Sequence, residues 1–73
     1  MIIVYTLPNC VQCSATVRHL NRLGLEYVLK DAQEALTALR DAGHTSAPVV
    51  YPEGLNGPSW AGYNPDKINA LAR

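Results

Sequence analysis

The only two cysteines of this 73-residue chain lie three positions apart, at Cys10 and Cys13. A disulfide between them would close a ring too short to restrain much of the unfolded chain, because the stabilisation depends on loop length. We therefore expect a chemical role for the pair and not a structural one. Two neighbouring thiols can alternate between dithiol and disulfide, which is the chemistry of thiol–disulfide exchange.

The position of the two cysteines along the chain predicts a different role for each thiol. An apolar strand precedes them and a helical pattern follows, so Cys10 falls at a helix N-terminus. Free backbone N–H groups and the helix dipole lower the pKa of a thiol at that position. Cys13 lies one turn further into the helix, closer to the core and within disulfide reach. We expect Cys10 to attack a partner's disulfide and Cys13 then to attack Cys10, which releases the reduced partner.

The same thiols could instead bind a metal. Zinc needs four ligands, and His19 and His44 match no zinc-finger spacing, so no metal site is predicted. An iron–sulfur cluster held between two chains stays open from the sequence, although nothing in the motif favours it. Two inert buried cysteines are the weaker alternative, because Pro8 and Asn9 place Cys10 at the boundary of an element, where side chains are usually reachable.

Seven elements, four strands and three helices, are predicted to position the cysteines. The strands are short apolar runs bounded by turn residues: Ile2–Tyr5, Glu26–Leu29, Ala47–Tyr51 and Ser59–Trp60. The helices carry apolar residues at helical spacing between capping residues: 9–23 before Gly24, 32–42 after Asp31, and 65–72 after Asn64. A strand, helix and strand in this order imply a right-handed unit with two parallel strands. The turn-rich residues 52–58 imply that the last two strands are antiparallel.

Length, composition and charge exclude several classes of function. Seventy-three residues allow one domain, 1–73, for which surface scaling gives about 4,400 Å² exposed and a thin stability margin. Hydrophobic residues make up 48 % of the chain, which argues against disorder. Six acidic residues balance six basic ones, which argues against binding to nucleic acids or to anionic membranes. The longest apolar run, Met1–Tyr5, is far shorter than the ~18 residues of a membrane span, and no secretion signal is recognisable. We expect a cytoplasmic protein.

Three sequence blocks resemble the NrdH-redoxin family, the glutaredoxin-like small redoxins. The blocks are Val4-Tyr5-Thr6-x-Pro8-x-Cys10-Val11-Gln12-Cys13, Ala47-Pro48-Val49-Val50 and Trp60-x-Gly62-Tyr63-x-Pro65-x-x-Ile68. The match runs essentially end to end. Its Cys-Val-Gln-Cys motif differs from the Cys-Gly-Pro-Cys of thioredoxins and the Cys-Pro-Tyr-Cys of many glutaredoxins.

The resemblance implies an α/β fold of the thioredoxin-like, glutaredoxin type, with a four-stranded mixed sheet and three helices in β-α-β-α-β-β-α order. It implies a cis peptide bond before Pro48, facing the cysteines. The sequence alone favours trans, because only about 5–6 % of X–Pro bonds in folded proteins are cis. The resemblance also implies a surface that binds the partner, made by Thr6, Val11, Gln12, Ala47, Pro48, Val49, Trp60, Gly62 and Tyr63.

The resemblance further implies a thioredoxin-like task. Family members take electrons from NADPH through thioredoxin reductase and pass them to class Ib ribonucleotide reductase. We therefore expect a monomer without a bound cofactor, whose partners are thioredoxin reductase and the large subunit of that ribonucleotide reductase. The alternatives are a glutathione-dependent glutaredoxin that reduces general protein disulfides, and a non-catalytic module that binds a metal, a cluster or another protein.

The residues around the motif argue against glutathione. This small anion is usually bound by a basic residue near the motif, a Thr-Val-Pro segment and a Gly-Gly turn. The corresponding positions hold Leu7, Ala47–Val49 and Ala61–Tyr63, without the charge and the second glycine. What remains is an apolar surface with Trp60 and Tyr63, which suits an extended protein segment.

Four residues depart from the family pattern: Leu7, His44, Ser46 and Ala61 stand where many members carry lysine, tyrosine, glutamine and serine. A leucine in place of lysine predicts a higher pKa for Cys10 than in a lysine-bearing relative. We expect His44 to be solvated and not a base, and His19 to lie on the surface. For both Trp60 and Tyr63 the sequence supports two roles, packing in the core and contact with a partner.

Overall fold

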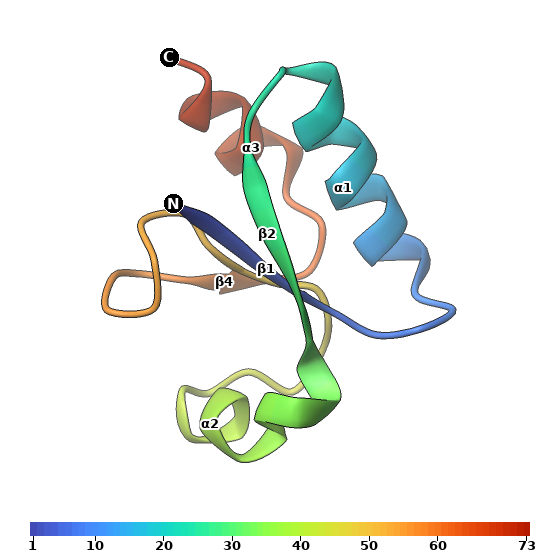
Figure 1. The fold of residues 1–73 in the computed structure, drawn as a ribbon, viewed down its shortest axis with the longest axis vertical. Coiled ribbons are helices and arrows are strands. Elements are labelled where there is room, and N and C mark those ends of the chain that lie inside the picture. The colour runs from blue at the N-terminus through green and yellow to red at the C-terminus, as the bar shows by residue number, and fades with distance from the viewer.

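The computed structural model describes all residues, 1–73, and consists of a four-stranded sheet with helices on both faces (Figure 1). The strands are β1 (Ile2–Thr6), β2 (Tyr27–Asp31), β3 (Val49–Tyr51) and β4 (Trp60–Ala61). The helices are α1 (Val11–Arg22), a 3₁₀ turn η1 (Ala32–Ala35) that leads into α2 (Leu36–Asp41), and α3 (Pro65–Leu71). No helix is long and apolar enough to cross a membrane.

The sheet has the strand order β2-β1-β3-β4, with β1 parallel to β2 and antiparallel to β3. β3 and β4 form the antiparallel hairpin that residues 52–58 predict. The apolar first strand therefore lies in the interior of the sheet, as its sequence indicates. The order of the elements and the mixed sheet confirm the predicted thioredoxin-like α/β architecture.

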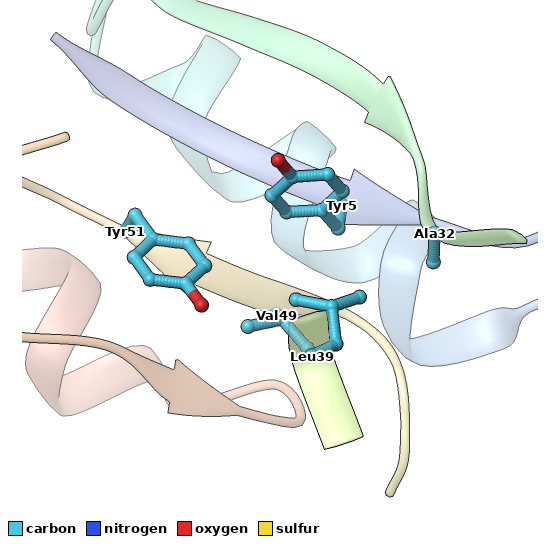
Figure 2. Close-up of a cluster of buried hydrophobic side chains, with 5 residues drawn as sticks. All are labelled: Tyr5, Ala32, Leu39, Val49 and Tyr51. Atoms are coloured by element: carbon cyan, nitrogen blue, oxygen red, sulfur yellow. The ribbon is translucent and has the colours of Figure 1, made fainter. Parts of the chain in front are cut away.

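The core consists of two layers, one on each face of the sheet, because successive strand residues point to opposite sides. One layer joins the sheet to α1 and α3: Val4, Leu20, Val50 and Ile68, all without exposed surface. The other joins it to η1 and α2 and is drawn in Figure 2: Tyr5, Ala32, Leu39, Val49 and Tyr51. The folded chain exposes 4631 Å², close to the ~4,400 Å² that scaling predicts for this mass.

Helix α1 ends as predicted, at a glycine in the left-handed region. Gly24 has φ +71, its N–H donates to the Asn21 carbonyl, and the Leu25 N–H donates to the Leu20 carbonyl. This pair of bonds satisfies two carbonyls that the helix leaves free at its end. The chain can therefore turn sharply into β2, which runs parallel to β1.

The second strand and the second helix differ from prediction. β2 begins and ends later than Glu26–Leu29, and the predicted helix 32–42 is divided into η1 and α2. The reason for the division is local: the Asp31 carboxylate accepts from the Gln33 N–H at 2.8 Å, and Ala35 has non-helical φ −125 and ψ 21. The cap accounts for where the first turn begins, and the non-helical backbone of Ala35 is where the 3₁₀ turn ends and α2 starts.

Candidate active site

The two cysteines lie at the start of α1, and each has the position that the sequence predicts. Cys10 is the N-cap, and its Sγ accepts a hydrogen bond from the Cys13 N–H at 3.2 Å. The two residues are joined in a disulfide with a Cα–Cα distance of 5.2 Å. Cys13 is buried, with 4 % of its surface exposed, whereas Cys10 is half-buried. Of the two sulfurs, that of Cys10 is thus the easier one for a partner to reach.

The sharp turn between β1 and α1 depends on Asn9, whose role the sequence reasoning missed. Asn9 has φ 58, the one non-glycine residue with positive φ. Asparagine is among the side chains that adopt the left-handed region most readily. An asparagine directly before an N-cap cysteine is the signal that could have identified this turn.

The loop before β3 faces the cysteines. The Ala47–Pro48 peptide bond is cis, and the Ala47 carbonyl oxygen lies 3.8 Å from Cys10 Sγ. Pro48 itself is fully buried. The expectation from the family resemblance is therefore confirmed, and the trans bond that the sequence alone favours is wrong.

The segment between β4 and α3 joins the motif to this loop. The Gly62 N–H donates to the Pro48 carbonyl at 2.7 Å, and the Tyr63 N–H donates to Gln12 Oε1 at 3.0 Å. Gly62 has φ +86, and a Cβ added there would meet Gln12 Oε1 at 3.2 Å. Three blocks far apart in the sequence are thus held together, and the Gln12 side chain accepts one of the two hydrogen bonds that the Gly62–Tyr63 segment donates.

The residues predicted to bind a partner differ widely in exposure. Val11 has 83 % of its surface exposed, Gln12 is exposed, and Tyr63 has 37 % exposed. Val49 and Pro48 are fully buried, so their side chains do not reach the surface. The remaining predicted residues, Thr6, Ala47, Trp60 and Gly62, are half-buried.

Trp60 serves mainly to pack the core. Its ring lies against the α1/α3 layer, its Nε1 atom is buried without a hydrogen-bond partner, and Lys67 Nζ lies 5.5 Å from the ring centroid. An open cleft beside Cys10 has a volume of about 870 Å³ and is lined by Leu7, Arg18 and Leu29 among others, but not by Trp60 or Tyr63. The apolar surface expected around the two aromatic residues is therefore separate from this cleft.

His19 is buried, which contradicts the expected surface position. Only 6 % of it is exposed, and it lies at the interface of α1 with α3, where Tyr63 and Asn69 bond both ring nitrogens. The physical reason is that α1 buries Thr16 and His19 beside Leu20, while Val17 is only half-buried. Polar partners on the neighbouring segment let a polar side chain occupy this face.

His44 also differs from its expected state. It is half-buried, its Nε2 lies 2.7 Å from Ser59 Oγ, and its ring forms a T-shaped pair with that of Tyr51. The residue is therefore fixed by neighbours and is not simply solvated. Its hydrogen bond ties the loop after α2 to Ser59, the residue before β4.

No group of three or more histidine, cysteine or acidic side chains is arranged to hold a metal ion. The thiols of Cys10 and Cys13 therefore have no neighbouring ligands within the chain that would complete a zinc site, which needs four. The arrangement is suited to thiol–disulfide exchange instead.

Comparison with known proteins places this site among redoxins. A family model for glutaredoxin matches residues 2–55. The glutaredoxin-like protein NrdH of Salmonella typhimurium is 40 % identical over 73 residues, which cover 96 % of this chain and 86 % of that protein.

Solved structures give the same result. NrdH-redoxin from Escherichia coli, a glutaredoxin-like protein with a thioredoxin-like activity profile, superposes with a TM-score of 0.86 at 40 % identity, over 96 % of this chain and 92 % of that one. The thioredoxin-like protein BC3987 gives a TM-score of 0.77 at 28 % identity, over 97 % and 99 % of the two chains.

Proposed function

The chain belongs to the glutaredoxin family, in its NrdH-redoxin group, and from this membership we propose that it carries electrons from thioredoxin reductase to class Ib ribonucleotide reductase. Its general activity is that of a thiol–disulfide oxidoreductase that uses the Cys10–Cys13 pair. The identity of the electron donor and acceptor is the proposed part.

The proposed exchange begins with the dithiol form. The Cys10 thiolate attacks one sulfur of the partner's disulfide, that bond breaks, and the other partner sulfur leaves as a thiolate that takes a proton from water. The Cys13 thiolate then attacks Cys10 Sγ in the mixed disulfide, and the second partner sulfur leaves in the same way. Two electrons have passed to the partner, and the Cys10–Cys13 disulfide has formed.

The geometry around Cys10 supports its role as the attacking thiol. The Cys13 N–H directed at Cys10 Sγ can stabilise negative charge on that sulfur, as can the N-terminus of α1. Cys13 is buried, so a partner's sulfur has no access to it. Cys10 does reach it, because the two form a disulfide. Reduction of the disulfide by thioredoxin reductase, with electrons from NADPH, follows the reverse exchange and requires no cofactor bound to this chain.

The proposal of thioredoxin reductase as the electron donor rests on the hydrogen bonds of the Ala61–Tyr63 turn. Its N–H groups at Gly62 and Tyr63 already donate to the Pro48 carbonyl and to Gln12. They are therefore not free to bind a carboxylate of glutathione. A relative of 40 % identity with a thioredoxin-like activity profile points in the same direction.

One observation favours the second candidate, a glutathione-dependent glutaredoxin. Arg18 lines the same cleft as Cys10, and its guanidinium can pair with a carboxylate. An Arg18→Gln variant tests this contribution, because it should lower the rate with glutathione and leave the rate with a thioredoxin reductase unchanged if Arg18 serves only glutathione.

The deciding experiment compares two electron sources. The oxidised protein is incubated with NADPH and thioredoxin reductase, or with glutathione and glutathione reductase, and the reduction of a ribonucleotide reductase of class Ib is followed. We expect turnover with thioredoxin reductase. Turnover with the glutathione system and none with thioredoxin reductase would refute the proposed donor.

A trapping experiment tests the roles of the two thiols. The Cys13→Ser variant should accumulate a mixed disulfide with its partner through Cys10, because the resolving thiol is gone. The Cys10→Ser variant is the matched control and should trap nothing. A mixed disulfide formed through Cys13 in that control would reverse the assigned roles.

A further inference from the structure

His19 is a buried polar residue that thiol–disulfide exchange does not use. It lies in α1, and both its ring nitrogens have a hydrogen-bond partner: Nδ1 lies 2.8 Å from the Tyr63 hydroxyl and Nε2 lies 2.7 Å from Asn69 Oδ1. The ring centroids of His19 and Tyr63 are 5.8 Å apart. Two ordered bonds on one imidazole fix the direction of the ring.

The chemistry of the two partners determines which nitrogen carries the proton. Asn69 Oδ1 can only accept, so Nε2–H donates to it. In the neutral ring Nδ1 must then accept, and the Tyr63 hydroxyl donates to it. The hydroxyl of Tyr63 is thus held by the buried His19, and the ring of Tyr63 is anchored to α1.

Tyr63 connects this histidine to the redox motif. The backbone N–H of Tyr63 donates to Oε1 of Gln12, the residue directly before Cys13. The N–H of the preceding Gly62 donates to the carbonyl of Pro48, at 2.7 Å. An anchor on the Tyr63 ring therefore restrains the one peptide segment that contacts both the motif and the cis-proline loop.

We propose that His19 is a positioning residue, which fixes Tyr63 and through it the side chain of Gln12, and so sets the affinity for the partner's disulfide-bearing segment. This proposal rests on the proposed function in one respect, that Gln12 and Tyr63 contact the partner. Both are exposed, and Gln12 lies between the two cysteines in the motif, whereas His19 is buried and hydrogen-bonded to Tyr63 and Asn69, not to a cysteine. His19 therefore changes partner binding and leaves the exchange chemistry of the thiols unaltered.

The test uses Tyr63→Phe, which removes the hydroxyl that His19 holds but keeps the ring and the backbone N–H. The matched control is Tyr27→Phe, because the Tyr27 hydroxyl also bonds a residue of α1, Asn21 Oδ1 at 2.9 Å, and is not hydrogen-bonded to Gln12 or to the Gly62–Tyr63 segment. Kinetics are measured with insulin as the disulfide substrate and dithiothreitol as the electron source. The NMR signals of the Gln12 side-chain amide and of the residue 63 amide report the position of Gln12 directly.

We expect Tyr63→Phe to raise KM for insulin by roughly three- to five-fold, the factor that one neutral hydrogen bond supplies, and to leave kcat within about two-fold. The Gln12 and residue 63 signals should shift. Tyr27→Phe should change neither KM nor these signals. Equal KM values and unmoved Gln12 signals in the two variants would overturn the proposal.

Two further variants separate positioning from packing. His19→Gln can donate to Asn69 and accept from Tyr63, so it should keep KM near that of the wild type. His19→Leu can do neither and should raise KM as Tyr63→Phe does. A His19→Gln protein with the KM of His19→Leu would contradict the role. Failure of the wild-type protein to reduce insulin would refute its oxidoreductase function. The Gln12 signals would still decide the role of His19 in that case.

Discussion

Replacement of Gly62 by alanine should damage both the stability and the partner affinity of this protein. Gly62 has φ +86, a conformation that costs an L-residue about 1 to 2 kcal/mol. The added Cβ would also lie 3.2 Å from Gln12 Oε1, so the Gln12 side chain must move and its bond to the Tyr63 N–H is weakened. Loss of that bond adds about 1 kcal/mol.

The matched control is Gly24→Ala at the far end of α1. Gly24 has φ +71, and its added Cβ would meet nothing within 4 Å, so only the backbone cost applies. Because 1 kcal/mol corresponds to about 4 to 8 °C in a domain of this size, Gly62→Ala should melt about 4 to 8 °C below Gly24→Ala.

Melting curves of the oxidised proteins and KM for insulin, measured well below the melting temperatures, complete the assay. Gly62→Ala should raise KM, and Gly24→Ala should not. Equal melting temperatures together with equal KM values would show that the contact between Gly62 and Gln12 contributes nothing.

Three further predictions concern the thiols and the core. Leu7 lines the same cleft as Cys10, so Leu7→Lys should lower the pKa of Cys10 in the reduced protein, measured by thiolate absorbance; an unchanged pKa would contradict this. Ile68 is fully buried in the α1/α3 layer, and Ile68→Ala should lower the free energy of unfolding by about 3 kcal/mol in denaturant titrations, whereas a loss below about 1 kcal/mol would mean that α3 repacks. The oxidised wild type should melt about 8 to 16 °C above the reduced form, because even its short ring contributes about 2 kcal/mol, and calorimetric curves that coincide would refute that contribution.

The order of the elements could be predicted because each one carries a strong local signal. The apolar run before the cysteines predicts the central strand, and Gly24 predicts the end of α1. The division of the second helix at Ala35 could not be predicted, since alanine favours a helix and residues 31–34 have the pattern of a capping box that opens a continuous one.

The placement of the thiols could also be predicted, because Cys10 and Cys13 lie on one short segment between a strand and a helix. The cis bond before Pro48 required the family resemblance, as local sequence favours the other isomer. The sequence pattern predicts the wrong face for His19 because its partners, Tyr63 and Asn69, lie 44 and 50 residues away. A polar residue at a helix interface can be recognised only when the facing segment is known.

The way in which the site is assembled explains why this chain can depart from its family at several positions and keep the same geometry. Two hydrogen bonds join the segments: a backbone bond from Gly62 N–H to the Pro48 carbonyl, and a bond from Tyr63 N–H to the Gln12 side chain. Neither Leu7 nor Ala61 supplies an atom to these bonds. Substitutions there change the surface that a partner meets while the thiols and the cis-proline loop keep their places. The departures should therefore alter which partners bind and how tightly, and keep the two-step exchange of the Cys10–Cys13 pair, with the pKa of Cys10 the one property of that chemistry that Leu7 changes.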